Sequence, residues 1–318
     1  GGYHQIQLAE SSRDLTCFLL PSGRWRYCRG PMGLSATSDE WCRRSDYIIQ
    51  GCGSAMKIVD DVIVWAASIE ELDDRMSEVL KRCAEINVTI SIKKFKVARE
   101  VSFAGYVVKH LKVRADPERA SALASFPVPK DIHELRSFMG LAQQLAGFVP
   151  DLAHVSRPMN ELLKKERAWF WDSCHQKSFE QVRKILTGDL VLTNFDPSRP
   201  VYLLTDASRL KGLGFALVHS DMVEGTRKTQ LVTCGSRSLT SAERNYAVCE
   251  IESLAITWAL KKCRYYLLGM PHFDIWSDHK PLQQIYIQNL DDVGNARIQN
   301  WREKTSMFNF TVTWVCLL

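Results

Sequence analysis

The stretch Val201-Tyr202-Leu203-Leu204-Thr205-Asp206-Ala207-Ser208 is an apolar run that ends on one acid and two small residues. Continuous hydrophobic residues bounded by a turn signal predict a buried strand. A carboxylate at the end of such a strand is fixed on a rigid scaffold beside solvent, as the metal site of a hydrolase requires. An Asp in this position is also a common turn former. Asp206 alone therefore leaves both interpretations open.

A second acid, Glu252, lies in the segment that follows Thr240. Thr240 and Glu243 have the spacing of a capping box, which predicts that a helix begins here. Apolar residues then recur at steps of three and four and define one helix face, namely Val248, Ile251, Leu254, Ala255 and Trp258. Glu252 lies beside that face, where its side chain can reach the edge of a sheet. Glu250 lies about 200° round the helix and is predicted to face solvent.

The third acid, Asp278, ends the strand-like run Phe273–Ser277, and Pro281 stops any extension of that strand. Asp274, inside the run, is expected to have no role in chemistry. Clustered carboxylates repel one another unless cations neutralise them. Two divalent ions roughly 4 Å apart would do so and would clamp an in-line displacement at phosphorus. Mg²⁺ suits such a site, because it prefers oxygen ligands and keeps water and substrate phosphates in its shell.

Residues 201–282 resemble the ribonuclease H domain of gypsy-type LTR-retrotransposon Pol polyproteins. The matching strings are Thr205–Ser208, Gly235–Thr240, Ala242–Tyr246, Glu250–Leu260, Arg264–Gly269 and Ser277–Leu282. The resemblance implies that Asp206, Glu252 and Asp278 are catalytic metal ligands. It also implies Mg²⁺, with Mn²⁺ as an alternative, and cleavage of the RNA strand of RNA–DNA hybrids. The family has a fourth metal-binding Asp beyond the strand expected at Phe308–Val315. Here the chain ends at Cys316–Leu318, so we expect slow cleavage at best.

The first part of the chain contains a second acid pair. Two short β-branched runs flank Asp60-Asp61 within Lys57–Trp65, which predicts a hairpin with the acids at its tip. A polar turn without chemistry explains the same pattern. Gly2–Leu8 alternates like a strand, and Gly30–Leu34 is predicted to be a loop.

This part resembles the palm of a reverse transcriptase from the same element family. The resemblance implies that Asp60 and Asp61 are catalytic and hold metal. It places Tyr3 where an aromatic ring screens the sugar of the incoming nucleotide, although a half-buried strand aromatic is the alternative. Gly33, Phe103 and Gly105 fall at substrate-binding positions, the last two in a primer-grip hairpin. The sequence departs from many relatives at Ile58, where they have Tyr.

The polymerase site has a further requirement. The family's other palm Asp lies four residues before the Gly-Tyr pair and would precede Gly1. We therefore expect this chain not to polymerise DNA. In the intact parent the resemblance implies RNA-directed DNA synthesis, with an RNA template, a DNA primer and deoxynucleotides as partners and with protease and integrase segments in the same polyprotein.

The expected fold class is a multidomain α+β and α/β chain. We predict a truncated reverse-transcriptase palm over 1–110 and a helical thumb and connection over 111–195, with helices capped by Asp116 and Asp131. An RNase H-like mixed sheet with packed helices follows over 196–318. Cations near the end of one connection helix could touch phosphate or could simply be solvated: Lys164, Lys165 and Arg167.

Composition limits the other function classes. The 318 residues carry a formal charge of +5, 46% hydrophobic and 24% charged residues, which is ordinary for globular protein and compatible with nucleic acid. The ten cysteines form no Cys-x-x-Cys pair or zinc spacing, and they indicate reduced thiols. No membrane span or signal peptide is expected, so we expect an intracellular protein, found in the cytoplasm, a virus-like particle or the nucleus. A non-catalytic nucleic-acid-binding remnant remains the alternative to an enzyme.

Overall fold

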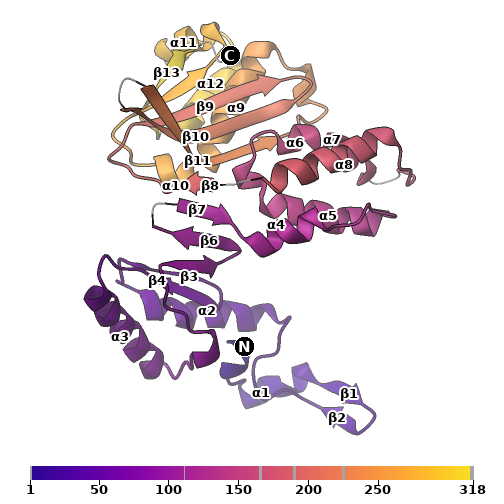
Figure 1. Cartoon of the computed structure of the whole chain (residues 1–318), viewed down its shortest axis with the longest axis vertical. Helices are drawn as coiled ribbons and strands as arrows, with labels where there is room; N and C mark the ends of the chain where they lie inside the picture. The colour runs from indigo at the N-terminus through magenta and orange to yellow at the C-terminus, as the bar shows by residue number, and fades with distance from the viewer. Residues whose placement is uncertain (1, 111, 165–166, 189–190, 224–225, 316–318) are drawn as a thin grey trace. The chain divides into compact units, whose positions relative to one another are not determined.

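The computed structural model describes residues 2–110, 112–164, 167–188, 191–223 and 226–315 (Figure 1). The chain divides into two compact units, residues 1–104 and 105–318. The mixture of helices with antiparallel and mixed sheets confirms the expected fold class. The three-part domain division with boundaries near 110 and 195 stays a prediction. Gly1, Lys165 and Cys316–Leu318, on which expectations rested, lie outside the described residues.

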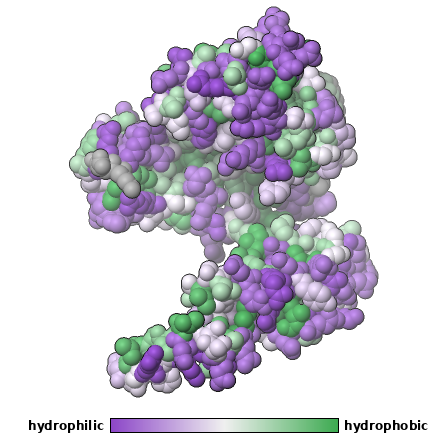
Figure 2. All heavy atoms as spheres, turned by 180° about the vertical axis from the view of Figure 1, so that it is seen from behind, coloured by the Kyte–Doolittle hydropathy of each residue, from purple (hydrophilic) through white to green (hydrophobic). Residues whose placement is uncertain are grey.

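The first unit is a small assembly of short elements. In chain order they are η1 (Tyr3–Gln5), α1 (Glu10–Arg13), η2 (Asp14–Thr16), β1 (Phe18–Leu20), β2 (Gly23–Trp25), α2 (Ser35–Ile49), β3 (Ala55–Ile58), β4 (Asp61–Val64), α3 (Ile69–Glu85), η3 (Ile92–Lys94) and β5 (Glu100–Phe103). β1–β2 and β3–β4 are antiparallel hairpins. Ile48 of α2 packs with Val79 and Cys83 of α3 in the unit's buried cluster. Large apolar side chains such as Leu19, Met32 and Ile92 are exposed on this unit, and Figure 2 shows hydrophobic residues on its surface.

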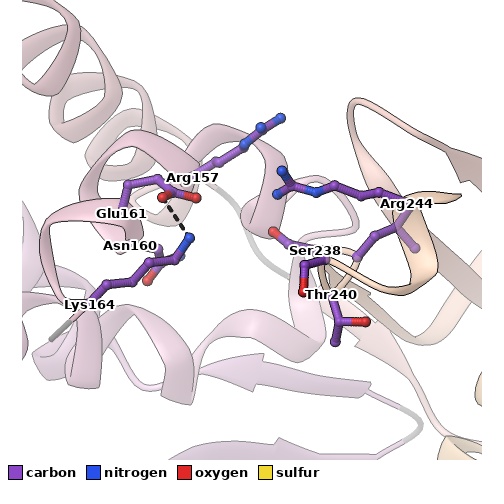
Figure 3. A pocket seen from close by; sticks show the side chains of 9 residues that line it. Arg157, Asn160, Glu161, Lys164, Ser238, Thr240 and Arg244 are labelled. Carbon is purple, nitrogen blue, oxygen red and sulfur yellow. Dashed lines mark hydrogen bonds and ion pairs between the residues drawn. The ribbon is translucent and has the colours of Figure 1, made fainter.

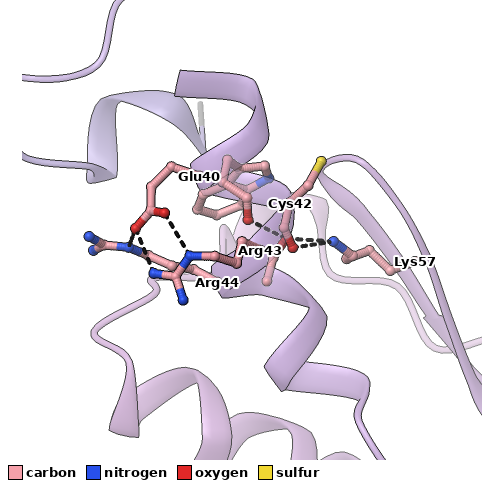
Figure 4. Close-up of polar contacts among 7 residues, drawn as sticks. Glu40, Cys42, Arg43, Arg44 and Lys57 are labelled. Atoms are coloured by element: carbon pink, nitrogen blue, oxygen red, sulfur yellow. Dashed lines mark hydrogen bonds and ion pairs between the residues drawn. The ribbon is translucent and has the colours of Figure 1, made fainter. Parts of the chain in front are cut away.

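Polar contacts hold the β3–β4 hairpin against α2 (Figure 4). The buried Nζ of Lys57 donates to the carbonyl oxygen of Cys42 at 3.1 Å and to Ser45 Oγ at 2.7 Å. At the tip of the hairpin, Trp41 Nε1 donates to the carbonyl oxygen of Val59 at 3.1 Å. A buried ammonium needs such partners, because an unpaired charge away from water is costly. The hairpin tip that carries Asp60 is therefore held in place by α2.

The prediction of a strand over Gly2–Leu8 is wrong, although Gln7 forms an isolated β-bridge with Arg29. The chain instead makes a 3₁₀ turn, in which the Gln5 amide donates to the Gly2 carbonyl at 2.9 Å. A Cβ on Gly2 would lie only 2.5 Å from the Trp41 ring. The backbone turns here because glycine lets it pass this close to the indole.

The helical part of the second unit has its own core. Its elements are β6 (Tyr106–Lys109), β7 (Lys112–Ala115), α4 (Pro117–Ala124), α5 (Ile132–Gln144), η4 (Ala146–Phe148), α6 (Leu152–Val155), α7 (Arg157–Leu162), α8 (Ser173–Leu186) and β8 (Val191–Thr193). Asp116 and Asp131 cap α4 and α5 as predicted, each accepting from backbone amides of the first turn. Phe138 and Phe179, both fully buried, pack with ring centroids 4.6 Å apart.

A five-stranded sheet makes up the rest of the second unit (Figure 1). The strands are β9 (Val201–Ser208), β10 (Gly212–Val223), β11 (Thr226–Arg237), β12 (Phe273–Ser277) and β13 (Phe310–Trp314), in the order β11-β10-β9-β12-β13. β9, β10 and β11 are antiparallel neighbours, whereas β12 runs parallel to β9 and β13. The helical elements are η5 (Glu243–Asn245), α9 (Val248–Lys262), α10 (Arg264–Leu267), α11 (Lys280–Ile287), η6 (Leu290–Asp292) and α12 (Ala296–Thr305). Leu203, Ile256 and Ile275 are fully buried where α9 packs on the sheet.

Helix α9 begins at Val248, not at Thr240 as predicted. Thr240 and Glu243 do exchange the two capping hydrogen bonds, at 2.8 and 3.3 Å, but these enclose the 3₁₀ turn η5. The extended backbone of Tyr246 (ψ 151°) then interrupts the helix. Glu250 supplies the working cap by accepting from the Ala247 amide at 2.8 Å.

The prediction that Glu250 faces solvent is wrong. Its side chain is buried, with 6% of its surface exposed, and one carboxylate oxygen accepts from Asn295 Nδ2 and Arg297 Nη1, both at 3.0 Å. Helix α12 and its N-cap residue Asn295 cover this side of α9 and supply both donors. The pKa of Glu250 lies below its ordinary value because of these hydrogen bonds, that of Asn295 above all.

Among the described residues, no helix is long and apolar enough to cross a membrane. The nine cysteines in the part of the chain that the structure describes are all free thiols.

Candidate metal centre

Three acids from three elements meet at one end of the second unit's sheet. Asp206 lies on β9, Glu252 on α9 and Asp278 directly after β12. Each offers one carboxylate oxygen, and these oxygens all lie within 4.8 Å of one another. Strand register explains part of the meeting: Trp276 pairs with Leu204 in the parallel β12–β9 ladder, so Asp278 comes level with Asp206 two residues later.

Glu252 shows most clearly that the cluster suits a cation. Its side chain is 4% exposed, and its Oε2 is buried without a hydrogen-bond partner. Burial above all, and then the nearby charges of Asp278 and Asp206, raise the pKa of Glu252 to about 8. An unpaired buried carboxylate oxygen is costly unless a proton or a cation compensates it. The donor set is all oxygen, which fits a hard divalent cation such as Mg²⁺.

Asp206, on the central strand β9, is exposed to solvent, as is Asp278. The pKa of Asp206 is raised, first by partial burial of the carboxyl group and then by Asp278. The exposed edge of Asp206 leaves one side of the cluster open to a substrate. The arrangement thus combines a buried acid at the base with accessible acids at the rim.

The loop that carries Asp278 is tied to β13. Trp314 Nε1 donates to the backbone oxygen of Asp278 at 3.1 Å, and the Lys280 ammonium lies 5.6 Å from the centre of the Trp314 ring. The His279 amide donates to Ser277 Oγ at 3.2 Å. Sequence reasoning assigned Trp314 to a strand only. Its position beside Asp278 depends on the β12–β13 pairing, which no local signal encodes.

The helical part of the second unit contacts the sheet at a residue that lies in the same cross-strand row as Asp206. Asp206 pairs with Gly214, and Gly214 pairs with Ser236 across the antiparallel ladders. Directly paired residues point to the same face of a sheet. Gly214 has no side chain, so the space between Asp206 and Ser236 on that face is not filled by it. The Ala153 amide, at the start of α6, donates to Ser236 Oγ at 3.0 Å. No local sequence pattern predicts this contact, because its partners are 83 positions apart.

The predicted polymerase residues Tyr3, Asp60 and Asp61 belong to the first unit. Asp60 follows Val59 (φ 52°) at the tip of the β3–β4 hairpin, and Asp61 begins β4. Tyr3 accepts from Ser38 Oγ–H at 2.8 Å through its hydroxyl group. A Cβ on Gly2 would lie 2.7 Å from Asp60 Oδ1, so the Gly2-Tyr3 turn lies against the acid. Among the described residues no further His, Cys, Asp or Glu joins the pair in a group of three.

The remaining predicted substrate contacts are backbone features. Gly33 has a φ of 88° in an open loop, and Phe103 ends β5 half-buried. Gly105 has a φ of 84°, and a Cβ there would collide with the Arg119 guanidinium. Nothing in these positions tests the roles that the resemblance implies.

The segment that contains the three acids matches a known domain family. Residues 196–308 match the model of the RNase H-like domain found in reverse transcriptase. This segment is an RNase H-like domain. It contains all three clustered acids.

Over nearly its whole length the chain is similar to retrotransposon polyproteins. It is 32% identical to the retrovirus-related Pol polyprotein from transposon gypsy of Drosophila melanogaster, over 98% of this chain and 30% of the polyprotein. It is 30% identical to the Pol polyprotein from transposon 297 of the same fly, over 99% and 29%, respectively. A Schizosaccharomyces pombe relative, the transposon Tf2-3 polyprotein, is 27% identical over 98% and 23%. The expected resemblance to gypsy-type Pol polyproteins is confirmed, and the chain spans about a third or less of these relatives.

Solved structures show the same fold. The foamy viral protease-reverse transcriptase in complex with RNA/DNA hybrid superposes with a TM-score of 0.81 at 18% identity, covering 100% of this chain and 43% of that one. The same viral protein in complex with dsDNA gives a TM-score of 0.78 at 18% identity, covering 100% and 66%.

Proposed function

We propose that the RNase H-like domain cleaves the RNA strand of RNA–DNA hybrids with the help of divalent cations held by Asp206, Glu252 and Asp278. Mg²⁺ is the proposed cofactor, and Mn²⁺ is the alternative. The observation that carries the proposal is the buried, unpaired Glu252 Oε2 inside a cluster whose oxygens lie within 4.8 Å of one another. A divalent cation, when bound, supplies an activated water and offsets the charge of the phosphate.

The chain's own residues determine where that chemistry would occur. Asp206 lies on β9 and Asp278 directly after β12, and these strands pair through their backbones, so the sheet constrains the separation of the two acids. Glu252 projects from α9, which packs on the same sheet. Sites on such regular elements hold their geometry better than sites on loops. Without cations, three carboxylates would repel a phosphodiester, so we expect productive substrate binding to depend on the metal.

The proposed substrate rests on the relatives. The matched domain is one found in reverse transcriptase, and solved structures of similar fold hold an RNA/DNA hybrid or dsDNA. We therefore propose the hybrid as the partner of this chain. Protease and integrase segments in a parent polyprotein, and work in the cytoplasm, a virus-like particle or the nucleus, belong to the same proposal.

Three duplexes of one sequence test the substrate. RNA–DNA, DNA–DNA and RNA–RNA duplexes, labelled on each strand in turn, are incubated with the chain in Mg²⁺ and then in Mn²⁺. The expected product is a set of short RNAs from the RNA–DNA duplex only. Cleavage of DNA–DNA, or of none of the three in either metal, contradicts the proposal. Salt-sensitive binding without any product would favour the non-catalytic remnant instead.

A second proposal concerns the first unit. Asp60 and Asp61 would hold metal for nucleotide addition in the intact parent, with Tyr3 selecting deoxynucleotides. The observation that favours it is the packing of the Gly2-Tyr3 turn against the Asp60 carboxylate. Primer extension on an RNA template with the intact parent, compared with its Asp60→Asn variant, tests it. Equal incorporation by both contradicts the assignment.

A further inference from the structure

Asp151 is an exposed acid of the helical part and directly precedes α6. An Asp in this position commonly caps the helix that follows, but the Asp151 side chain makes no capping hydrogen bond. Among the described residues, its carboxylate has no hydrogen-bond or ion-pair partner. The side chain is therefore available to a ligand, and its place in the fold indicates which one.

Two hydrogen bonds hold the chain around Asp151 on strand β11. Cys234 Sγ donates to the carbonyl oxygen of Gly147 at 3.2 Å. The Ala153 amide donates to Ser236 Oγ at 3.0 Å. Asp151 lies between these two anchors along the chain, so it is held close to residues 234–236 of β11.

These β11 residues lead across the sheet to Asp206. Ser236 pairs with Gly214, and Gly214 pairs with Asp206. Neighbouring strands lie about 4.8 Å apart, so Ser236 and Asp206 are on the order of 10 Å apart. Gly214 contributes no side chain to the space between them. A group held beside Ser236 therefore has a path along this row toward the acids.

The charge of Asp151 acts on both sides of this space. Burial above all, and then the charge of Asp151, raise the pKa of the Cys234 thiol to about 12. The pKa of Asp206 is raised by burial, then by Asp278 and also by Asp151. A charge that acts on groups of both β11 and β9 has to lie near both strands. The Asp151 carboxylate is thus a neighbour of the metal centre on its helical side.

Lysines near the acids do not balance their charge. Lys211 is close enough to Asp206 to oppose the rise in its pKa, which burial and the other acids cause. On α7, Lys164 pairs with Glu161 at 2.6 Å and lines a cleft that contains none of the three clustered acids or Asp151 (Figure 3). A single ammonium cannot balance four carboxylates, and a divalent cation would offset the excess negative charge.

The unpartnered oxygen of Glu252 points independently to a cation at this place. Glu252 Oε2 is buried without a hydrogen-bond partner in a residue that is 4% exposed. Asp151 is outside the group whose oxygens lie within 4.8 Å of one another, so it would meet the cation through water. Mg²⁺ keeps several waters in its shell, and groups beyond the direct ligands orient that shell through hydrogen bonds.

We propose that Asp151 accepts a hydrogen bond from the water shell of a divalent cation held at Asp206, so that the cation ties the helical part to the RNase H-like domain. The inference rests on the proposed cation site and not on the proposed substrate. Asp151 is a positioning residue in this assignment, because it acts on the cation through water. The domain match begins at residue 196, and neither it nor the resemblance assigns Asp151 a role.

The first test is a calorimetric titration of the full chain with Mn²⁺. Wild type is compared with Asp151→Asn and with the control Glu180→Gln, which removes an exposed acid of α8 outside the cluster. Loss of a group beyond the direct ligands lowers metal affinity by about 10–100-fold. We expect a loss of about tenfold in Asp151→Asn and no change in Glu180→Gln. Because Asp151 makes no capping bond, Asp151→Asn should unfold at the same temperature as wild type in EDTA.

The second test separates a link through the cation from a charge that acts only through space. Hydrogen exchange at the Ala153 amide is followed in EDTA and at Mg²⁺ concentrations that saturate each protein. Mg²⁺ is expected to slow this exchange in wild type and in Glu180→Gln, because the cation holds α6 on the sheet. In Asp151→Asn, saturation with Mg²⁺ should leave the exchange at its rate in EDTA.

Equal Mn²⁺ affinity in wild type and Asp151→Asn, or equal slowing of the Ala153 amide in both, overturns the proposal and leaves the proposed ribonuclease function standing. If both readouts behave as expected but no hybrid is cut, the ribonuclease function fails and the link at Asp151 remains. If wild type binds no Mn²⁺ at all, both are overturned.

Discussion

Replacing Glu252 by Gln should stabilise the metal-free protein at neutral and alkaline pH. In the folded chain the pKa of Glu252 is raised from 4.5 to about 8 by burial and by its acidic neighbours. Between these two pH values the folded protein keeps a proton that the unfolded chain has lost. The stability of the wild type must therefore fall as pH rises through this window.

The magnitude follows from the same two values. At about 1.36 kcal/mol per pH unit, Glu252 lowers the free energy of unfolding by about 3 kcal/mol at pH 7. The loss reaches a ceiling of about 5 kcal/mol near pH 8. Relaxation and water entry reduce such penalties, so we expect about 1–3 kcal/mol to be recovered in Glu252→Gln. For a unit of this size that gain corresponds to roughly 3–8 °C in Tm.

The assay is thermal unfolding in EDTA at pH 5 and pH 8, repeated with Mg²⁺. Glu252→Gln should match the wild type at pH 5 and exceed it at pH 8. Mg²⁺ should stabilise the wild type, by about 2.7 kcal/mol at a hundred times its Kd, and the variant much less. The reasoning is refuted if Glu252→Gln is no more stable than wild type at pH 8, or if Mg²⁺ stabilises both equally.

Glu250→Gln is the matched control, two residues away on the same helix. The pKa of Glu250 is lowered by Asn295, the Ala247 amide and Arg297. Its ionised form therefore stabilises the fold above the ordinary pKa of about 4.5, and this contribution disappears as pH falls through the folded pKa. Glu250→Gln should destabilise the protein at pH 8 and have little effect in acid, the opposite of Glu252→Gln.

Two further predictions concern the supports of the metal centre. Gly212→Ala should destabilise the second unit by about 1–3 kcal/mol, because Gly212 has a φ of 101° and a Cβ there would collide with the Arg237 carbonyl oxygen; urea unfolding should show no such loss for Gly294→Ala, whose Cβ would meet open space. Trp314→Phe should weaken Mn²⁺ binding severalfold in a calorimetric titration while leaving Tm nearly unchanged. It removes the indole N–H that donates to the Asp278 backbone and keeps an aromatic ring at a position that is partly exposed. Unchanged affinity would show that this hydrogen bond does not position the acid.

The sequence predicted the three acids and the elements that carry them, because each acid follows a strong local pattern. Asp206 and Asp278 end short apolar runs, and Glu252 lies beside an apolar helix face. The sequence suggested that the three acids cluster round a cation, and the resemblance implied that they are metal ligands; the distance of 4.8 Å between their oxygens comes from the structure. It follows from parallel pairing of β12 with β9, which no local pattern in either strand specifies.

The error at Glu250 arises because tertiary packing overrides a local signal. Glu250 was assigned to solvent by helix geometry, but α12 supplies Asn295 and Arg297 from 45 and 47 positions away. The hydrogen bonds predicted between Thr240 and Glu243 do form. They enclose a 3₁₀ turn of three residues and do not begin the long helix that was expected.

Cleavage of an RNA–DNA hybrid across a Mg²⁺ titration tests the central claim most directly. Wild type is compared with Asp206→Asn and with Asp274→Asn, which removes a half-buried acid from β12 outside the cluster. We predict that the rate of RNA-strand cleavage rises with Mg²⁺ in wild type and in Asp274→Asn and is lost in Asp206→Asn. Equal rates in wild type and Asp206→Asn, or cleavage that persists in EDTA, would contradict a metal-dependent site built on these three acids.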